Sequence, residues 1–223
     1  MDETGAPTGN ADGNNLTGKR GRPWVLLTAV VTVFLQGLSR STTAAIELPG
    51  STVGGIVVSD RFSACNHLPS QQRRLCWAHL IRHLTASAER PGASAEFGAQ
   101  LLELQRLGYQ RGERTPWANT VRTAQQLLQL ADGLWTFLET RGSEPTTNGA
   151  ARALHQSVIQ RRINGLPGNS RGVQSSQGAI CRSRQLTVIT TPRQQGRAVW
   201  QFLEQAWLAH HRGGVMPSLL PDP

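Results

Sequence analysis

Acidic residues are the scarcer class of charged side chain in this 223-residue sequence. Fourteen Asp and Glu stand against 23 Lys and Arg, which gives a formal net charge of +9. Such a balance favours a polyanionic partner such as nucleic acid. A basic surface that only keeps the protein in solution would have the same composition, so the charge alone leaves both interpretations open.

Cysteine and long hydrophobic runs are also scarce. Cys65, Cys76 and Cys181 are odd in number and lack C-x-x-C spacing, which argues against a disulfide scaffold or a zinc knuckle and predicts reduced thiols in a cytoplasmic protein. The most apolar run, Trp24 to Leu35, is about twelve residues long, whereas a membrane span needs roughly twenty. Its Val and Thr content instead predicts two strands that turn near Thr28 and Ala29, so we expect no membrane partner.

A short apolar run that ends at a carboxylate is the stretch around which we expect the chain to be organised. Gly54 and Gly55 precede Ile56 to Ser59, and Asp60 follows. Apolar β-branched runs bounded by turn residues predict a buried strand, and open α/β sheets bind their ligands at such strand ends. The alternative is that Asp60 only caps the turn that follows.

The remaining segments predict a mixed α/β chain. Thr8 to Gly21 reads as a hairpin connection, and Ser41 to Leu48 as a helix that Pro49-Gly50 ends and that crosses over to the strand before Asp60. Leu75 to His79 fits either a short strand or the start of a helix. Further predicted helices cover residues 95–107, 117–139, 150–162 and 178–209, the last interrupted at Pro192, and residues 165–172 predict a loop.

Several motifs resemble the insertion-sequence-66 family of DDE transposases. They are Asp2-Glu3-Thr4-Gly5, then Val58 to Ala64, Cys76-Trp77-Ala78-His79-Leu80-Ile81-Arg82, Glu144-Pro145-Thr146 with Asn148, and Arg152-Ala153-Leu154. The resemblance implies an RNase H-like mixed sheet with flanking helices over residues 1–164. It also implies a helical insertion at about 92–142 and a loop and helical C-terminal region over 165–223.

The same resemblance implies a metal-dependent site. In such proteins three carboxylates converge at one edge of a sheet and hold two divalent ions, Mg²⁺ or Mn²⁺, which activate water and then a DNA 3′-hydroxyl. Carried over by motif, Asp2 and Asp60 are the first two carboxylates, and both are expected to be catalytic and metal-binding. The third should be a Glu on the helix after Asn148, where this sequence has Ala151.

That departure predicts an impaired site. We expect Asp2 and Asp60 to lie side by side, Ala151 to face them, metal binding to be weakened, and DNA cleavage to be absent, with Ala151→Glu alone restoring little. The chain begins at the first Asp, so we expect the upstream portions of the family to be missing. The segment around residues 105–108 looks spliced, Cys65 replaces a usual Tyr, and residues 164–170 look inserted.

Two function classes therefore stay open. One is a DDE-type transposase of an insertion sequence, and the other is a non-catalytic DNA-binding remnant. In both, phosphate contacts are expected from a set of arginines, although a solvated surface is an equal alternative for them: Arg152, Arg161, Arg162, Arg182, Arg184 and Arg193. His79 fits a structural hydrogen-bonded histidine better than a metal-site residue. The expected partners are DNA and a further transposase copy, identical or full-length, at the nucleoid.

Overall fold

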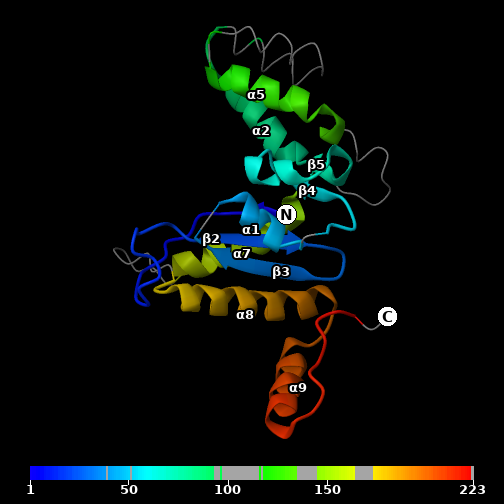
Figure 1. Ribbon diagram of the computed structural model, residues 1–223. Helices are drawn as coiled ribbons and strands as arrows, with labels where there is room; N and C mark the ends of the chain where they lie inside the picture. Colours follow the sequence, from blue (N-terminus) through cyan, green and yellow to red (C-terminus); the bar gives the residue numbers. More distant parts are fainter. Residues whose placement is uncertain are drawn as a thin grey trace. The chain divides into compact units, whose positions relative to one another are not determined.

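The computed structural model describes residues 1–38, 40–50, 52–92, 96, 116, 118–134, 145–163 and 173–221. The chain divides into two compact units, Met1–Ser51 with Gly149–Pro223, and Thr52–Asn148 (Figure 1). Predicted features at residues 97–107, 135–144 and 164–172 lie outside the described residues. The expected boundary at residues 164 and 165 is among them, and so is the predicted loop that follows it.

The first unit contains a three-stranded antiparallel sheet of order β1-β2-β3. The strands are β1 (Asp2–Glu3), β2 (Arg22–Leu27) and β3 (Thr32–Gly37). Thr28 closes the turn between β2 and β3, because its backbone N–H donates to the Val31 carbonyl at 2.9 Å and its hydroxyl accepts from the Val31 N–H at 3.0 Å. The two strands predicted from the Trp24 to Leu35 run are therefore confirmed.

The connection from β1 to β2 is tied together by one buried side chain. Asn15 is 3% exposed and donates its amide to the carbonyls of Thr8, at 3.0 Å, and Lys19, at 2.9 Å. Its carbonyl oxygen accepts from the Lys19 N–H at 2.9 Å. These side-chain bonds satisfy backbone groups that have no strand partner in the connection.

Four helices of the described residues surround this sheet or extend from it. They are α1 (Thr42–Glu47), α7 (Asn148–Ile163), α8 (Ser176–Gln194) and α9 (Val199–Arg212). In Figure 1, α1 and α8 lie on opposite sides of β2 and β3. The core of the unit joins the sheet to α7 and α8 through buried Val25, Phe34, Ala150, Leu154 and Leu186.

Helix α8 covers the outer edge of β3 with two threonines one turn apart. The Thr191 hydroxyl accepts from the Thr32 N–H at 3.1 Å and donates to the Thr32 carbonyl at 2.9 Å. The Thr187 hydroxyl accepts from the Phe34 N–H at 2.9 Å. Backbone groups of an edge strand otherwise invite another strand to pair with them, and here the helix satisfies them.

The predicted interruption at Pro192 is wrong. Helix α8 continues through Pro192 to Gln194. The break follows at Gly196, whose φ is 71°, where the Arg197 N–H donates to the Pro192 carbonyl at 2.8 Å and the Gly196 N–H to the Arg193 carbonyl at 3.1 Å. This is the bonding pattern of a Schellman cap, for which glycine is the favoured residue.

The second unit contains the strand predicted before Asp60. β4 (Val57–Ser59) pairs in parallel with β5 (Arg73–Leu75). Leu75 ends a strand and α2 (Trp77–Ala88) begins two residues later, so both interpretations of the Leu75 to His79 segment hold in part. Helix α5 (Ala118–Gln129) confirms the first part of the helix predicted over residues 117–139. A turn at Leu130 interrupts it, residues 131–134 are helical again, and the rest of the predicted span lies outside the described residues. Leu75, Leu80, Leu84, Ala124, Leu127 and Leu134 form the core.

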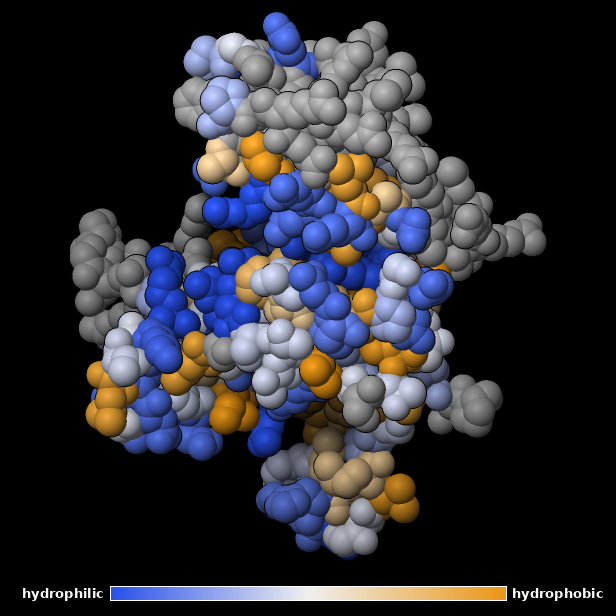
Figure 2. Space-filling view, turned by 45° about the horizontal axis from the view of Figure 1, so that its top comes forward, coloured by the Kyte–Doolittle hydropathy of each residue, from blue (hydrophilic) through white to orange (hydrophobic). Residues whose placement is uncertain are grey.

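The strands of the described residues form a three-stranded sheet in one unit and a two-stranded sheet in the other, and the single mixed sheet that we expected stays a prediction. The chain is a mixed α/β protein, and an RNase H-like arrangement of its sheets stays a prediction. On the face shown in Figure 2, hydrophilic residues are interspersed with small groups of hydrophobic ones. Among the described helices, none is both long and apolar enough to cross a membrane.

Candidate active site

Asp2 lies on the edge strand of the first sheet, on the side that the core helices cover. It is paired with Val25 of β2, and Val25 with Phe34 of β3, and directly paired residues point to the same face of a sheet. One carboxylate oxygen, Oδ1, accepts from the Glu3 N–H at 2.9 Å. Asp2 is half-buried. It belongs to the sheet face on which Val25 packs in the core with residues of α7 and α8.

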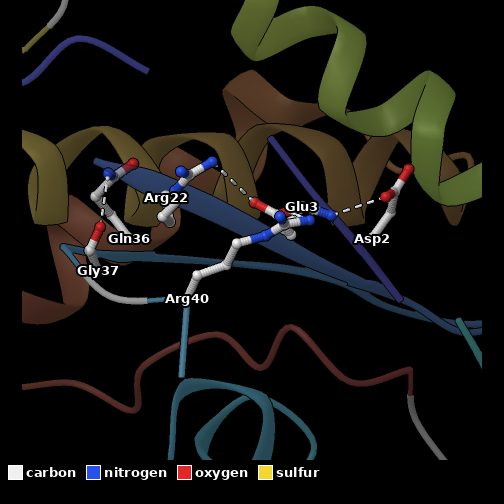
Figure 3. Close-up of polar contacts among 6 residues, drawn as sticks. All are labelled: Asp2, Glu3, Arg22, Gln36, Gly37 and Arg40. Carbon is white, nitrogen blue, oxygen red and sulfur yellow. Dashed lines mark hydrogen bonds and ion pairs between the residues drawn. The ribbon is translucent and has the colours of Figure 1, made fainter. Parts of the chain in front are cut away.

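Glu3 points away from Asp2, because successive side chains of a strand alternate between its faces (Figure 3). Its carboxylate forms ion pairs with Arg40 and, at 3.8 Å, with Arg22, and its side chain is 8% exposed. Two arginines thus balance this buried charge. Of the two acidic residues at the start of the chain, Asp2 is the better candidate for a metal ligand and Glu3 has a structural role.

Asp60 follows β4 directly and shapes the turn after it. Its Oδ1 accepts from the Phe62 N–H at 2.9 Å, which supports the capping role that the sequence left open. A carboxylate has two oxygens with about four acceptor positions between them, so this one bond is compatible with a metal ligand as well. Asp60 can therefore cap the turn and bind a metal ion at the same time.

Arg73, on β5, holds the same turn from the inside. Only 2% of this residue is exposed. Its guanidinium donates to Asn66 Oδ1 at 2.6 Å and to the carbonyls of Asp60, at 3.4 Å, and Phe62, at 3.3 Å. Burial lowers the pKa of Arg73, and the nearby charge of Asp60 opposes that effect. The sequence pattern gave no sign of this role, because arginine is normally an exposed residue.

The third position of the predicted site lies at the start of α7. This helix confirms the one predicted after the Asn148 turn, and it begins at Asn148 itself. Ala150 is buried in the core cluster that contains Val25, whereas Ala151 is exposed. Gly149 permits the close approach, because a Cβ there would lie 2.6 Å from Leu27 Cδ2. Ala151 therefore follows a residue that packs on the sheet face of Asp2.

Asp2 and Asp60 belong to different compact units, and their convergence stays a prediction. So does the orientation of Ala151 toward Asp60. Within the described ranges no cluster of three or more His, Cys, Asp or Glu is arranged to hold a metal ion. Glu139 and Glu144, the other nearby carboxylates in the sequence, lie outside those ranges.

Comparison with known protein families decides the family. The model of the Transposase IS66 family matches residues 1–114, which is half of the 223-residue chain. The chain belongs to the IS66 family of transposases. No curated protein and no solved structure matches it. Asp2, Asp60 and the Cys76 to Arg82 motif lie inside the matched residues of this transposase family, whereas Ala151 lies beyond them.

Cys76, in the matched part of this IS66-family chain, has a strongly lowered pKa. Its sulfur accepts from the Thr147 N–H at 3.1 Å and from the Thr147 hydroxyl at 3.2 Å. Burial raises the pKa of this thiol, but hydrogen bonds from His79 and Thr147 outweigh burial and bring the pKa to about 6. The bond from His79 supports the structural role predicted for that histidine. The motif that contains Cys76 gave no indication of this perturbed thiol.

The arginines predicted to contact DNA do not all share one surface. Arg152 on α7 is exposed, and so are Arg184 and Arg193 on α8, while Arg182 is half-buried. A helix turns about 100° per residue, so Arg182 and Arg193 point in nearly the same direction and Arg184 points the opposite way. The side chains of Arg161 and Arg162 lie outside the described part of the chain.

Proposed function

We propose that this IS66-family chain binds DNA phosphates and a divalent ion but does not cut DNA, because Ala151 replaces the third carboxylate of a DDE site. One observation carries the proposal. Ala151 is an exposed residue in the first turn of a helix whose preceding residue, Ala150, packs on the sheet face that bears Asp2. A Glu side chain at position 151 would reach the solvent beside that face without disturbing the core.

The metal site requires the carboxylates of Asp2 and Asp60 to converge. Asp2 lies on β1, and Asp60 directly follows β4. An RNase H-like fold, which the family motifs imply, would bring two such carboxylates to one edge of a single mixed sheet. The proposed metal site depends on that convergence.

The residues present fit a single weakly held Mg²⁺ or Mn²⁺. Such ions accept one or two carboxylates and fill their remaining positions with water and phosphate oxygens. Asp2 and Asp60 each supply a carboxylate that one backbone N–H already orients. When bound, the ion would supply Lewis-acid activation of water. Without the third carboxylate, the chain would hold a second ion poorly, and loss of one electrostatic element typically costs about a hundred- to thousandfold in rate.

DNA contacts would come from arginines at the surface and be directed at phosphates. Arg193 on α8 and Arg152 on α7 are exposed, and Arg182 on α8 is half-buried. Contacts of this kind carry no base readout and weaken steeply with salt. We therefore expect weak, salt-sensitive DNA binding with little sequence preference from these residues.

The decisive experiment compares Mn²⁺ affinity and DNA cleavage in the unmodified chain and in Ala151→Glu. We expect no measurable cleavage by the unmodified chain, and at least about tenfold tighter Mn²⁺ binding by Ala151→Glu. The matched control is His155→Glu, which adds the same charge at an exposed position one turn farther along α7. Robust metal-dependent cleavage by the unmodified chain would contradict the proposal.

The second candidate is a DNA-binding remnant without a metal site. The capping bond from the Phe62 N–H to Asp60 favours it, because this bond gives Asp60 a purely structural use. Asp60→Asn separates the two candidates, since an amide oxygen still accepts that bond but is a far weaker ligand for Mg²⁺. Loss of Mn²⁺ binding in Asp60→Asn, with stability unchanged, would favour the metal site. Negligible Mn²⁺ binding by both the unmodified chain and Asp60→Asn would favour the DNA-binding remnant.

A further inference from the structure

Helix α9 carries an apolar stripe that faces outward. Trp200, Leu203 and Trp207 recur at intervals of three and four residues and are 77%, 41% and 58% exposed. The opposite side of the helix anchors it through Phe202, which is 7% exposed. Figure 1 shows α9 projecting away from α8 and the sheet of its unit. A concentration of large exposed apolar side chains marks an interaction surface.

A groove of about 590 Å³ runs beside α8 and meets this stripe. It lies on the side of α8 opposite the core residue Leu186, and its lining includes Ile180, Cys181, Arg184, Val188, Ile189 and Leu203. Leu203 belongs to both the stripe and the groove, so the two features form one continuous surface. The groove is large enough for bulky side chains, since ligand pockets start at about 300 Å³.

The stripe and the groove carry opposite charges. Residues 173–221 contain five arginines and one acidic residue, Glu204. Glu204 is exposed on α9 between the two tryptophans of the stripe, and Arg184 is exposed in the groove. A docked helix that carries Glu204 would therefore place a carboxylate near the guanidinium of Arg184.

We propose that two copies of this chain associate through this surface, with the α9 stripe of each copy seated in the α8 groove of the other. A surface that contains both a projecting stripe and its complementary groove is self-complementary, as a twofold interface requires. Four tryptophans bury about 150–250 Å² each, which supplies roughly half of a standard interface of about 1,600 Å². The inference is independent of the metal chemistry proposed above.

Sedimentation equilibrium of the full chain tests the association. We expect a dimer with a Kd in the range of about 1–10 µM, and Trp200→Ala and Trp207→Ala should each raise that Kd at least about tenfold. Val215→Ala and Leu220→Ala are the matched controls, because these residues are 96% and 61% exposed but lie outside α9. They should leave the Kd unchanged. A monomer at all concentrations, or a dimer that no stripe substitution weakens, would overturn the proposal.

Charge reversal tests the pairing of the two features. Glu204→Arg and Arg184→Glu should each weaken the dimer at least about tenfold, and the double variant should recover most of that loss. Both side chains are exposed at the surface, so circular dichroism should show an unchanged fold. If each single change weakens the dimer and the double variant does not recover, the two side chains do not pair and the proposed docking is wrong.

The exposed thiol of Cys181 reports the geometry directly, because it lies in the groove while Cys65 and Cys76 are buried. The unmodified chain is mixed with a Trp207→Cys, Cys181→Ser chain, at concentrations well above the raised Kd expected from the loss of Trp207. The mixture is treated with copper phenanthroline, which oxidises two thiols to a disulfide. Peptide mass spectrometry should find Cys181 of one chain joined to the introduced thiol of the other. If instead single-stranded DNA quenches the fluorescence of these tryptophans while the chain stays monomeric, the surface binds nucleic acid and the dimer proposal fails.

Discussion

Thr147 donates both its backbone N–H and its hydroxyl to the sulfur of Cys76, at 3.1 and 3.2 Å. The two residues are 71 positions apart in the sequence. Cys76 directly precedes α2, and Thr147 directly precedes α7. A sulfur with donors on several sides favours the thiolate, and the start of a helix favours a negative charge there as well.

This arrangement predicts a pH-dependent stability. The pKa of Cys76 is about 6 in the folded chain against an ordinary value of 9.0, so between these pH values the unfolded chain binds a proton that the folded chain does not. The stabilisation is complete above pH 9.0 and is lost as the pH falls through about 6. Urea unfolding from pH 6 to 9 should show a free energy that rises by up to about 1.4 kcal/mol per pH unit.

The variant Thr147→Val tests whether the hydrogen bonds to Cys76 cause this pH dependence. Thr147→Val removes one donor to the sulfur, so the thiolate absorbance at 240 nm should titrate at a higher pH than in the unmodified chain. Difference spectra against Cys76→Ser isolate this thiol from the other two cysteines. A Cys76 midpoint at its ordinary value of 9.0 in the unmodified chain would contradict the assignment.

Arg73 should be irreplaceable by lysine. Its planar guanidinium reaches Asn66 Oδ1 and the carbonyls of Asp60 and Phe62 together, which a single ammonium group does not do. Arg73→Lys should lower the unfolding free energy by about 2 kcal/mol and speed hydrogen exchange at residues 60–66. Arg82→Lys, at an exposed position of α2, should change neither measurement.

The threonines on α8 should stabilise the edge of β3. Thr191→Val removes a hydroxyl that accepts from the Thr32 N–H and donates to the Thr32 carbonyl, and leaves both buried groups unpaired. We expect the unfolding free energy to fall by about 1–3 kcal/mol, measured by urea titration. Thr190→Val on the same helix is the control, and an equal decrease in both variants would show that the strand-edge bonds are unimportant.

The arginines of α8 should separate DNA binding from self-association. Arg182 and Arg193 share one side of the helix, so Ala at each position should weaken DNA binding and lower the salt slope of binding by about 0.9 for each phosphate that the variant no longer neutralises. Arg184→Ala should affect the dimer and leave the DNA salt slope unchanged, because it points to the opposite side. Fluorescence anisotropy across a salt series distinguishes the two sides.

Local patterns in the sequence predicted the local elements well. β-Branched residues on both sides of a turn predicted the β2–β3 hairpin, and the helical spacing after Asn148 predicted α7; the structure contains both. The sequence pattern wrongly predicted a break at Pro192, because proline lacks the N–H that a helix interior needs. In the structure, burial of Pro192 and the bond from the Thr191 hydroxyl to the Thr32 carbonyl of β3 offset that loss. Helix propensity carries no information about such tertiary contacts.

The candidate site was predictable only as a set of residue types. The strand before Asp60 and the carboxylate of Asp2 followed from the sequence pattern and from the family motifs. The buried guanidinium of Arg73 and the thiol of Cys76 did not, because each depends on contacts with residues distant in the sequence. The opposite orientations of Asp2 and Glu3 became visible only with the register of β1, which puts the two carboxylates on opposite faces.

The opposite faces of β1 lead to a direct test of the two carboxylates. Glu3→Gln removes the partner of Arg22 and Arg40, so it should lower stability and leave Mn²⁺ binding unchanged. Asp2→Asn should abolish Mn²⁺ binding with little effect on stability. Electron paramagnetic resonance of free Mn²⁺ and urea unfolding measure the two properties, and the reverse pattern would move the metal ligand from Asp2 to Glu3.

The most direct test of a metal shared by Asp2 and Asp60 is cleavage of the chain by Fe²⁺ bound in place of Mg²⁺. With ascorbate and peroxide, a bound Fe²⁺ generates hydroxyl radicals that cut the backbone close to the metal. The account predicts a cut near Asp60 that disappears in Asp2→Asn as well as in Asp60→Asn, and that strengthens in Ala151→Glu. A cut near Asp60 that persists in Asp2→Asn would show that the two carboxylates do not hold the same ion.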